Sequence, residues 1–211
     1  MSWRESPASL DVPVTPILQS GTNFNQRYLR DFDSLSILVQ KLRNQGLRIV
    51  LTQGVFDLIH EGHAKYLEMA KSYGDVLIVG VDSDELTRIR KGDGRPIVPQ
   101  KERIEMLVHL RHVDVVVVRE QHHGIGDLIH LVKPDVLVVS STTKDFSSDM
   151  KLNKQMREDY ENVCGDIVVL PPQGTAHTSA RIRQLTIEGA EKLASEINDL
   201  TRDFINKIRK S

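Results

Sequence analysis

The chain has 211 residues, 39% hydrophobic and 27% charged, which is enough to bury one good core and a small appendage. Its 28 Lys and Arg against 29 Asp and Glu give a formal net charge of -1, so no broad positive face exists for nucleic acid or an anionic membrane. We therefore expect anions to be bound locally by a few residues, with neither nucleic acid nor a membrane as a partner.

The N-terminal sequence MSWRESPASLDVPVTPIL has polar residues and three prolines where a secretion signal needs an uninterrupted apolar run. No later stretch approaches the roughly 20 apolar residues of a membrane span. The single cysteine, Cys164, has no partner for an internal disulfide. These features predict a cytoplasmic protein, with residues 1–32 as an irregular N-terminal arm.

From Asp33 onward, helical and strand patterns alternate. Leu35, Leu38 and Leu42 recur at helical spacing, and Gly46 is placed to end that helix. Five short, β-branched apolar runs follow along the chain, each predicting a buried strand. The predicted strands are residues 48–52, 76–81, 114–118, 135–139 and 166–170. The further predicted helices are residues 61–73, 101–110, 125–132 and 152–162.

Near-continuous apolar strands separated by helices are typical of a parallel sheet covered on both faces. We predict a Rossmann-like, doubly wound α/β domain with a five-stranded parallel sheet over residues 33–186. In such sheets ligands bind beyond the carboxyl ends of the strands, where the strand order reverses. The candidate site is therefore expected just after the first predicted strand.

Residues 187–211 predict a separate C-terminal helix. Leu193, Ile197, Leu200, Phe204 and Ile208 follow one another at spacings of three and four, which gives a narrow apolar stripe. The stripe fits either a homodimer seam or packing against the chain's own domain, and the pattern leaves both open.

The stretch TQGVFDLIHEGHAKYL, residues 52–67, places two histidines where the first strand gives way to a helix. Gly54 permits a sharp turn and close backbone approach, and the helix start offers free N–H groups to phosphate. His60 and His63, one turn apart, are expected to donate to neighbouring phosphate oxygens, with Gly62 leaving room for a nucleotide. Asp57 fits a site residue or a simple cap or turn residue equally well.

The segment GVFDLIHEGH resembles the GxFDxxHxGH signature of the nucleotidyltransferase superfamily that contains glycerol-3-phosphate cytidylyltransferase and the heptose-phosphate adenylyltransferase domain. The segment VDSDELTRIRKGDGRPIVPQKERIEML is similar to the second region of that family, with a lysine, a Gly-Arg-Pro turn and a Glu-Arg pair. KPDVLVV fits as well, and the resemblance extends over residues 33–185.

Two further segments depart from the family pattern. The third motif, Ser-Thr-Thr-x-Ile or Ser-Ser-Thr-x-Ile-Arg, is matched in part by TSARIR, in which Thr178, Ser179 and Arg183 keep their polar groups and Ala180 does not. The loop SSTTKDF, residues 140–146, replaces the Gly-containing loop that lies near the base in the family. The choice between ATP and CTP therefore stays open.

The resemblance implies an enzyme in which a substrate phosphate oxygen attacks the α-phosphorus of a nucleoside triphosphate and expels pyrophosphate. Catalysis would come from alignment and pre-placed positive groups. Mg²⁺ would accompany the triphosphate. It keeps several waters and binds phosphate oxygens, so no dedicated metal-binding residues are expected, although Asp57 is one candidate contact.

The resemblance also implies roles for single residues. His60 and His63 would hold the triphosphate, and Lys91 would bridge the α-phosphate and the incoming phosphate. The remaining expected nucleotide-binding residues are Gly54, Val55, Phe56, Asp57, Gly62, Arg95, Arg103, Thr178, Ser179 and Arg183.

Within the enzyme class, the GRPIVP turn and the length of the second region favour a sugar-phosphate adenylyltransferase of the heptose type. A cytidylyltransferase acting on glycerol-3-phosphate, another polyol phosphate or an amino-alcohol phosphate is the alternative. A nucleotide-binding module without turnover is the rival from another class, supported by Ala180 and by residues 140–146. Class I aminoacyl-tRNA synthetases share a similar histidine motif, but this chain lacks their Lys-Met-Ser-Lys-Ser loop and a basic tRNA face. The implied partners are a nucleoside triphosphate, a small phosphorylated substrate and a second copy of the chain.

Overall fold

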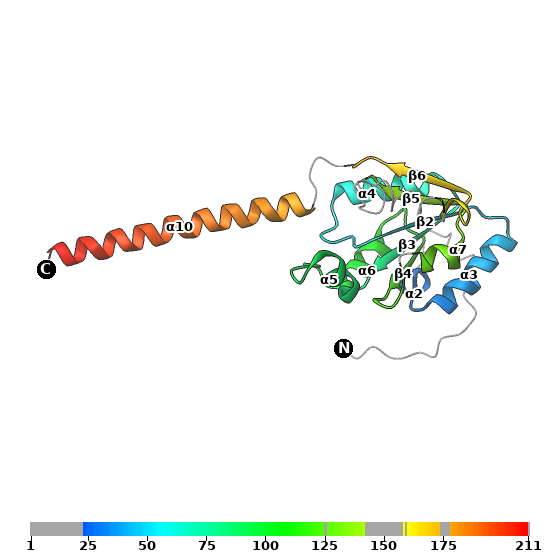
Figure 1. Cartoon of the computed structure of the whole chain (residues 1–211), viewed down its shortest axis with the longest axis horizontal. Helices are drawn as coiled ribbons and strands as arrows, with labels where there is room; N and C mark the ends of the chain where they lie inside the picture. Colours follow the sequence, from blue (N-terminus) through cyan, green and yellow to red (C-terminus); the bar gives the residue numbers. More distant parts are fainter. Residues whose placement is uncertain (1–22, 125, 142–157, 159, 174–177, 211) are drawn as a thin grey trace. The chain divides into compact units, whose positions relative to one another are not determined.

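The computed structural model describes residues 23–124, 126–141, 158, 160–173 and 178–210; within the last range it describes side chains for residues 185–202. The chain divides into two compact units, residues 1–174 and 175–211. The first unit carries the sheet, and the second consists of the last helix (Figure 1). Among the described residues, no helix is both long enough and apolar enough to cross a membrane.

The described strands form one sheet, parallel throughout, in the order β1-β4-β3-β2-β5-β6. Their bounds are β1 (Tyr28–Leu29), β2 (Ile49–Gly54), β3 (Val76–Asp82), β4 (Val115–Arg119), β5 (Val136–Ser140) and β6 (Asp166–Leu170). The five predicted strands are confirmed to within a residue or two at each end, but β6, expected to be buried, has only Leu170 buried. The sheet has a sixth strand, β1, which was not predicted because two residues carry no periodicity.

The described helices are α2 (Phe24–Arg27), α3 (Phe32–Asn44), α4 (Glu61–Lys71), α5 (Asp84–Lys91), α6 (Gln100–His109), α7 (Asp127–Val132) and α10 (Thr178–Lys210). Residues 24–29, expected to be irregular, instead form α2 and β1. The helix expected from residue 187 belongs to a longer helix that begins at Thr178. The helix expected over 152–162 lies mostly outside the described residues.

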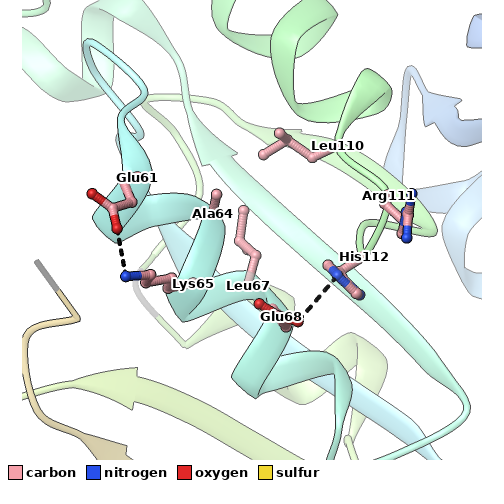
Figure 2. A pocket seen from close by; sticks show the side chains of 8 residues that line it. All are labelled: Glu61, Ala64, Lys65, Leu67, Glu68, Leu110, Arg111 and His112. Atoms are coloured by element: carbon pink, nitrogen blue, oxygen red, sulfur yellow. Dashed lines mark ion pairs between the residues drawn. The ribbon is translucent and has the colours of Figure 1, made fainter.

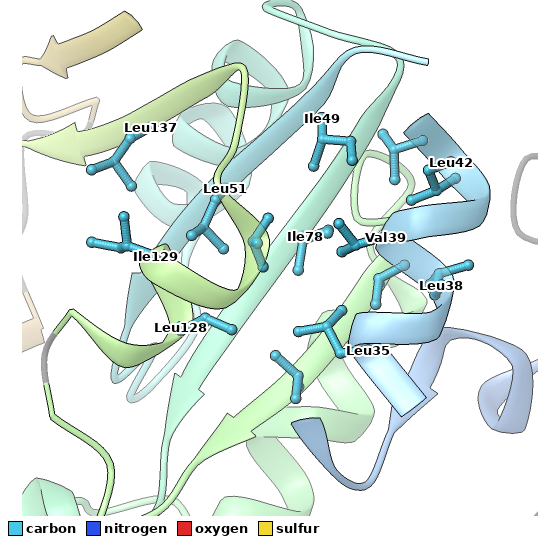
Figure 3. Close-up of a cluster of buried hydrophobic side chains, with 14 of the residues drawn as sticks. Leu35, Leu38, Val39, Leu42, Ile49, Leu51, Ile78, Leu128, Ile129 and Leu137 are labelled. Atoms are coloured by element: carbon cyan, nitrogen blue, oxygen red, sulfur yellow. The ribbon is translucent and has the colours of Figure 1, made fainter. Parts of the chain in front are cut away.

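Alternation along the strands divides the core between the two faces of the sheet. Ile49, Leu51 and Ile78 face α3 and α7, and Figure 3 shows these side chains gathered between the helices and the sheet. Val50 and Leu77 face α4 and α6 on the other side. Each central strand is therefore buried on both faces, as near-continuous apolar strands require.

The strand order places the first helix turn of α4 at the crevice of the sheet. From β2 the chain builds outward through β3 and β4, then crosses back to add β5 on the other side of β2. Strand order therefore reverses between β2 and β5, and Gly54, the last residue of β2, lies at that point. The histidine loop therefore follows the strand at which the order reverses, as expected, and a ligand site there stays a prediction.

Candidate active site

The two signature histidines cap the helix that follows β2. His60 is the N-cap residue of α4, and its Nδ1 accepts a hydrogen bond from the Gly62 amide at 3.0 Å. His63 Nδ1 accepts from the His60 amide at 3.4 Å, which completes a reciprocal capping box. A neutral imidazole that accepts at Nδ1 carries its proton on Nε2. Both histidines therefore hold an Nε2–H donor, and their ring centroids lie 4.1 Å apart.

The loop between β2 and α4 has an unusual backbone. Phe56 has φ 53° and Leu58 has φ 47°, both in the left-handed region that residues other than glycine seldom enter. We expected the turn at Gly54, but the positive φ angles come two and four residues later. A Cβ at Gly54 would lie 3.4 Å from Phe56 Cε2, about van der Waals contact, so the Phe56 ring packs closely against this glycine. Strained backbone of this kind concentrates at functional sites.

Asp57 connects the histidine loop to the second motif. Its carboxylate is 2% exposed and accepts hydrogen bonds from the Ile97 amide at 3.0 Å and the Val98 amide at 2.9 Å. Arg95 Nη1 lies 3.1 Å from Asp57 Oδ2. Asp57 is about forty positions away from Ile97 and Val98 in the sequence. Its carboxylate therefore joins the histidine loop to the loop that precedes α6. The structure favours the joining role over the metal contact that the sequence left open.

Arg103 lies entirely inside the protein. Its guanidinium donates to three carbonyl oxygens, those of Val98 at 2.9 Å, Val55 at 2.6 Å and Asp82 at 2.9 Å. Its Nη2 also pairs with Asp84 Oδ1 at 2.7 Å. The side chain is 0% exposed. In this structure Arg103 therefore positions the loops at the strand ends, rather than making the direct phosphate contact that we expected.

Lys91 ends α5 and lies close to both loops. Its side chain is exposed to solvent. The pKa of Lys91 is nevertheless lowered from the usual 10.5, first by partial burial of the ammonium group and then by the charge of Arg95. Asp82 and Asp57 act in the opposite direction. An exposed ammonium held among fixed charges is suited to an anionic ligand. The phosphate-bridging role of Lys91 stays a prediction.

A buried ion network next to this site was missed by the sequence analysis. Asp82, at the end of β3, is fully buried and accepts from Arg119 Nε at 3.0 Å. Its other oxygen accepts from Arg90 Nη1 at 2.7 Å. The available signal was a charged residue directly after an apolar run, in VLIVGVD and in VVVVR. Such residues stand at the carboxyl ends of parallel strands, where ligands bind.

Positive charge exceeds negative charge around the histidine loop. The cations that this part of the structure brings together are Arg90, Lys91, Arg95, Arg103 and Arg119. The carboxylates are Asp57, Asp82 and Asp84. Among these named groups, the cations outnumber the carboxylates by two. A polyanion such as a triphosphate would neutralise that excess.

Two expected parts of the site lie outside the described residues. Of the loop 140–146, only Ser140 and Ser141 are described. Thr178, Ser179 and Arg183 belong to α10, but their side chains are not among those described. The third motif and the loop near the base therefore remain predictions.

A surface pocket lies on another side of α4, between this helix and the turn after α6 (Figure 2). Its lining residues are Glu61, Ala64, Lys65, Leu67, Glu68, Leu110, Arg111 and His112. Glu61 pairs with Lys65, and His112 Nε2 lies 3.7 Å from Glu68 Oε1. None of the lining residues belongs to the predicted site, so this pocket is not the candidate active site.

Comparison with models of known protein families shows to which family the chain belongs. The model of the cytidylyltransferase-like family matches residues 51–185, a range that starts in β2 and contains both the histidine loop and the segment joined to it by Asp57. The chain belongs to the cytidylyltransferase-like family. Membership confirms the resemblance that the motifs indicated, and it supports an enzyme that transfers a nucleotidyl group.

Relatives of this cytidylyltransferase-like chain include proteins with a longer sequence. The bifunctional protein HldE of Nitratiruptor sp. is 47% identical over 113 residues, 54% of this chain and 24% of the relative. The protein of the same name from Desulfatibacillum aliphaticivorans is 38% identical over 159 residues, 75% of this chain and 31% of the relative. The chain thus spans about a quarter to a third of the length of these relatives.

Among solved structures, the lipopolysaccharide core biosynthesis protein from Thermoplasma volcanium is 28% identical to this chain. The match covers 59% of this chain and 97% of that protein, with a TM-score of 0.50. The Rossmann-like fold predicted from the sequence is confirmed, with six strands in place of five.

Proposed function

We propose that this chain transfers an adenylyl group from ATP to a small sugar phosphate of the heptose type. An oxygen of the substrate phosphate attacks the α-phosphorus and forms a new P–O bond. The bond between the α-phosphorus and the bridging oxygen to the β-phosphate breaks, and that oxygen leaves with its electron pair as pyrophosphate. No redox step or further co-reactant is required.

The observation that carries this proposal is the capping arrangement of His60 and His63. With both Nδ1 atoms accepting backbone hydrogens, two Nε2–H donors stand at the N-terminus of α4, where the helix dipole also favours negative charge. Donors placed in advance stabilise charge that develops on the α-phosphoryl and pyrophosphate oxygens. Lys91 then aligns the two reacting phosphates, which would otherwise repel one another.

Magnesium would be held by the triphosphate rather than by a protein cage. The oxygens of Asp57 accept from two amides and lie beside Arg95, and the described residues contain no group of three or more metal-binding side chains. Mg²⁺ commonly binds phosphate oxygens and keeps several waters, so the donor set fits an ion delivered with the nucleotide. When bound, the ion would neutralise phosphate charge.

The sugar-phosphate assignment is supported by the relatives named HldE and by the GRPIVP turn that Asp57 holds. The description of the matched family favours a second candidate, a transfer from CTP to a polyol phosphate or amino-alcohol phosphate. Both candidates use the same described groups. They differ at the base, which the family binds near residues 140–146.

The first test is thermal unfolding with ATP, CTP, GTP and UTP, each with Mg²⁺. A ligand at one hundred times its Kd adds about 2.7 kcal/mol to the free energy of unfolding. For a chain of this length that is roughly 5–11 °C in Tm. We expect the shift with ATP; a shift confined to CTP would select the second candidate, and no shift with any triphosphate would contradict both.

The second test is pyrophosphate release from the selected triphosphate with a panel of sugar, polyol and amino-alcohol phosphates. We expect release to depend on a sugar phosphate and to be lost in His63→Ala. Nucleotide binding without release for any acceptor would instead identify the non-catalytic binding module.

A further inference from the structure

The last helix carries an apolar stripe whose described side chains are exposed. Leu193, Ile197 and Leu200 are 57%, 53% and 71% exposed and follow one another at spacings of four and three. The helix has 33 residues, which corresponds to about 50 Å, longer than the roughly 30 Å width of a small domain. The stripe itself, positions 193–208, takes up about 24 Å of that length, so its own domain and a second helix are both long enough to cover it.

Charge is distributed unevenly along the same helix. Arg181 and Arg183 lie in the first turns of the helix, and from Thr186 to Asp199 the sequence then has four acidic residues and one lysine, a net charge of -3. From Leu200 to Ser211 it has four basic residues and one aspartate, a net charge of +3. A helix lying on an anionic membrane surface would carry basic residues along its whole polar face, so this distribution does not favour a lipid surface.

We propose that α10 pairs with α10 of a second copy of this chain, in antiparallel orientation. An antiparallel pair lays the acidic half of each helix against the basic half of the other, whereas a parallel pair would set like charges together. Under a two-fold axis between positions 200 and 201, the sequence positions pair as 193 with 208, 197 with 204, and 200 with 201. The complementary halves thus select both the partner and the direction.

One pair of charges tests the direction specifically. Glu196 and Lys207 are eleven residues apart, close to three helical turns, so both positions lie on the same flank of the stripe. The two-fold axis of an antiparallel pair brings the same flank of both copies together, so position 196 of one copy lies near position 207 of the other. Charged residues beside an apolar seam determine partner choice and orientation in this way. The pairing does not depend on nucleotide transfer.

The first experiment is analytical ultracentrifugation of the full chain from 1 to 100 µM. We expect a dimer that Leu200→Asp converts to a monomer. Ile89→Asp is the matched control, because Ile89 is also a strongly exposed apolar residue, 69% exposed, but lies on α5. A chain that remains monomeric throughout, or a dimer that persists in Leu200→Asp, would overturn the proposal.

The second experiment exchanges the flanking charges. Glu196→Lys and Lys207→Glu are each expected to raise the dimer Kd about tenfold, because each replaces two weak attractions with two repulsions. The double variant restores both pairs and should return the Kd to near that of the unmodified chain. Additive weakening in the double variant would reject the antiparallel register.

The third experiment reads orientation by disulfide cross-linking in a Cys164→Ala background, which removes the natural cysteine. Chains with Leu193→Cys and chains with Ile208→Cys are mixed and oxidised. The antiparallel pair predicts a cross-link between the two kinds of chain and little between chains of one kind. Cross-links within each kind alone would show a parallel pair and refute the proposal.

Discussion

His60 and His63 each use one ring nitrogen to bind the backbone, and this determines what the other nitrogen can do. The Gly62 and His60 amides occupy the two Nδ1 atoms, so a neutral ring presents a hydrogen-bond donor at Nε2. A histidine in a mobile loop would exchange between tautomers and lose part of this preference. The capping box therefore gives the pair a defined donor direction before any ligand binds.

Replacing His63 by alanine removes one of these donors. We expect the activation barrier to rise by about 3–4 kcal/mol, the usual effect of losing a donor to developing charge, which lowers kcat roughly 10²–10³-fold. Steady-state pyrophosphate release measures it. His109→Ala is the control, because this exposed histidine on α6 pairs only with its helix neighbour Glu105 among the described contacts. Full turnover in His63→Ala would remove the residue from the mechanism.

Replacing Lys91 by methionine should change activity and stability in opposite directions. Burial and Arg95 hold the pKa of Lys91 below its usual 10.5, so the folded protein binds this proton less tightly than the unfolded chain does. The resulting loss of stability is fully present below the folded pKa and is relieved as pH rises from that value towards 10.5. We expect Lys91→Met to melt at a higher temperature at pH 7 and to lose turnover.

A pH series of melting curves checks the origin of that effect. The advantage of Lys91→Met should shrink as the pH rises towards and past 10.5, because the unmodified lysine becomes neutral in both states only above that pH. Lys65→Met serves as the opposite control, because Glu61 raises the pKa of Lys65 and its loss should not stabilise the protein. A lower melting temperature for Lys91→Met at pH 7 would contradict the proposed balance of charges.

The sequence predicted which charged residues lie near the candidate site. It was less successful in predicting which groups each of those residues contacts. Asp57 was open to two roles, and Arg103 was expected to bind phosphate. The structure gives both side chains contacts with residues forty or more positions away, for example Arg103 with Val55. No local spacing reports such contacts. A motif identifies the residue types, whereas the fold determines whether a guanidinium faces a ligand or a carbonyl.

At the scale of elements, Tyr66 attaches the histidine helix to the sheet. Its hydroxyl donates to the Val138 carbonyl at 3.0 Å in β5 and lies 2.7 Å from Thr52 Oγ1 in β2. Burial raises the pKa of Tyr66, so the hydroxyl keeps its proton and remains a donor. The hydroxyl bridges the two strands between which strand order reverses. The orientation of α4 therefore depends on this contact.

Removal of that hydroxyl in Tyr66→Phe should lower the free energy of unfolding by about 1–3 kcal/mol, because Thr52 Oγ1 and the Val138 carbonyl lose a buried partner. Urea unfolding measures the change, and kcat should fall at the same time because the histidines are carried by the same helix. Tyr73→Phe is the control, expected within about 0.5 kcal/mol. An unchanged stability would show that water replaces the hydroxyl.

Long apolar elements were predicted from the sequence, and short polar ones were not. Four of the five predicted strands, β2 to β5, are mostly buried and carry an apolar run, as in β3, whereas β6 shows the run while being largely exposed. Helix α5 has only eight residues, mostly charged, and is started by the Ser83 side chain, which accepts from the Leu86 amide at 3.1 Å. Strand β1 has two residues and exists because β4 offers it a partner. Elements formed by tertiary contact leave little local pattern.

At the scale of the whole molecule, the sheet unit should unfold as one cooperative body. Ile78 lies in β3 with no exposed surface, in the core cluster that α3 and α7 cover. We expect Ile78→Ala to cost about 2–5 kcal/mol, the range for a large-to-small change in a packed core. Ile89→Ala, at a site 69% exposed, should change stability by less than about 0.5 kcal/mol.

Denaturant unfolding followed by fluorescence and by circular dichroism measures both variants. Coincident transitions with an unchanged m-value are expected, since the two faces of the core share the same strands. Separate transitions for Ile78→Ala would mean that the two faces unfold independently.

The two-residue strand β1 has a consequence for solubility. It covers the outer side of β4 through Tyr28 beside Val116 and Leu29 beside Val117, and Arg27 secures it by donating to the Val108 and Val113 carbonyls. Strand β4 contains a run of four valines. Such a strand pairs with other chains when the backbone N–H and C=O groups of its outer edge have no partner. A shortened protein that begins at residue 33, the boundary suggested by the sequence pattern, would expose that edge and should aggregate, although every residue of the candidate site would still be present.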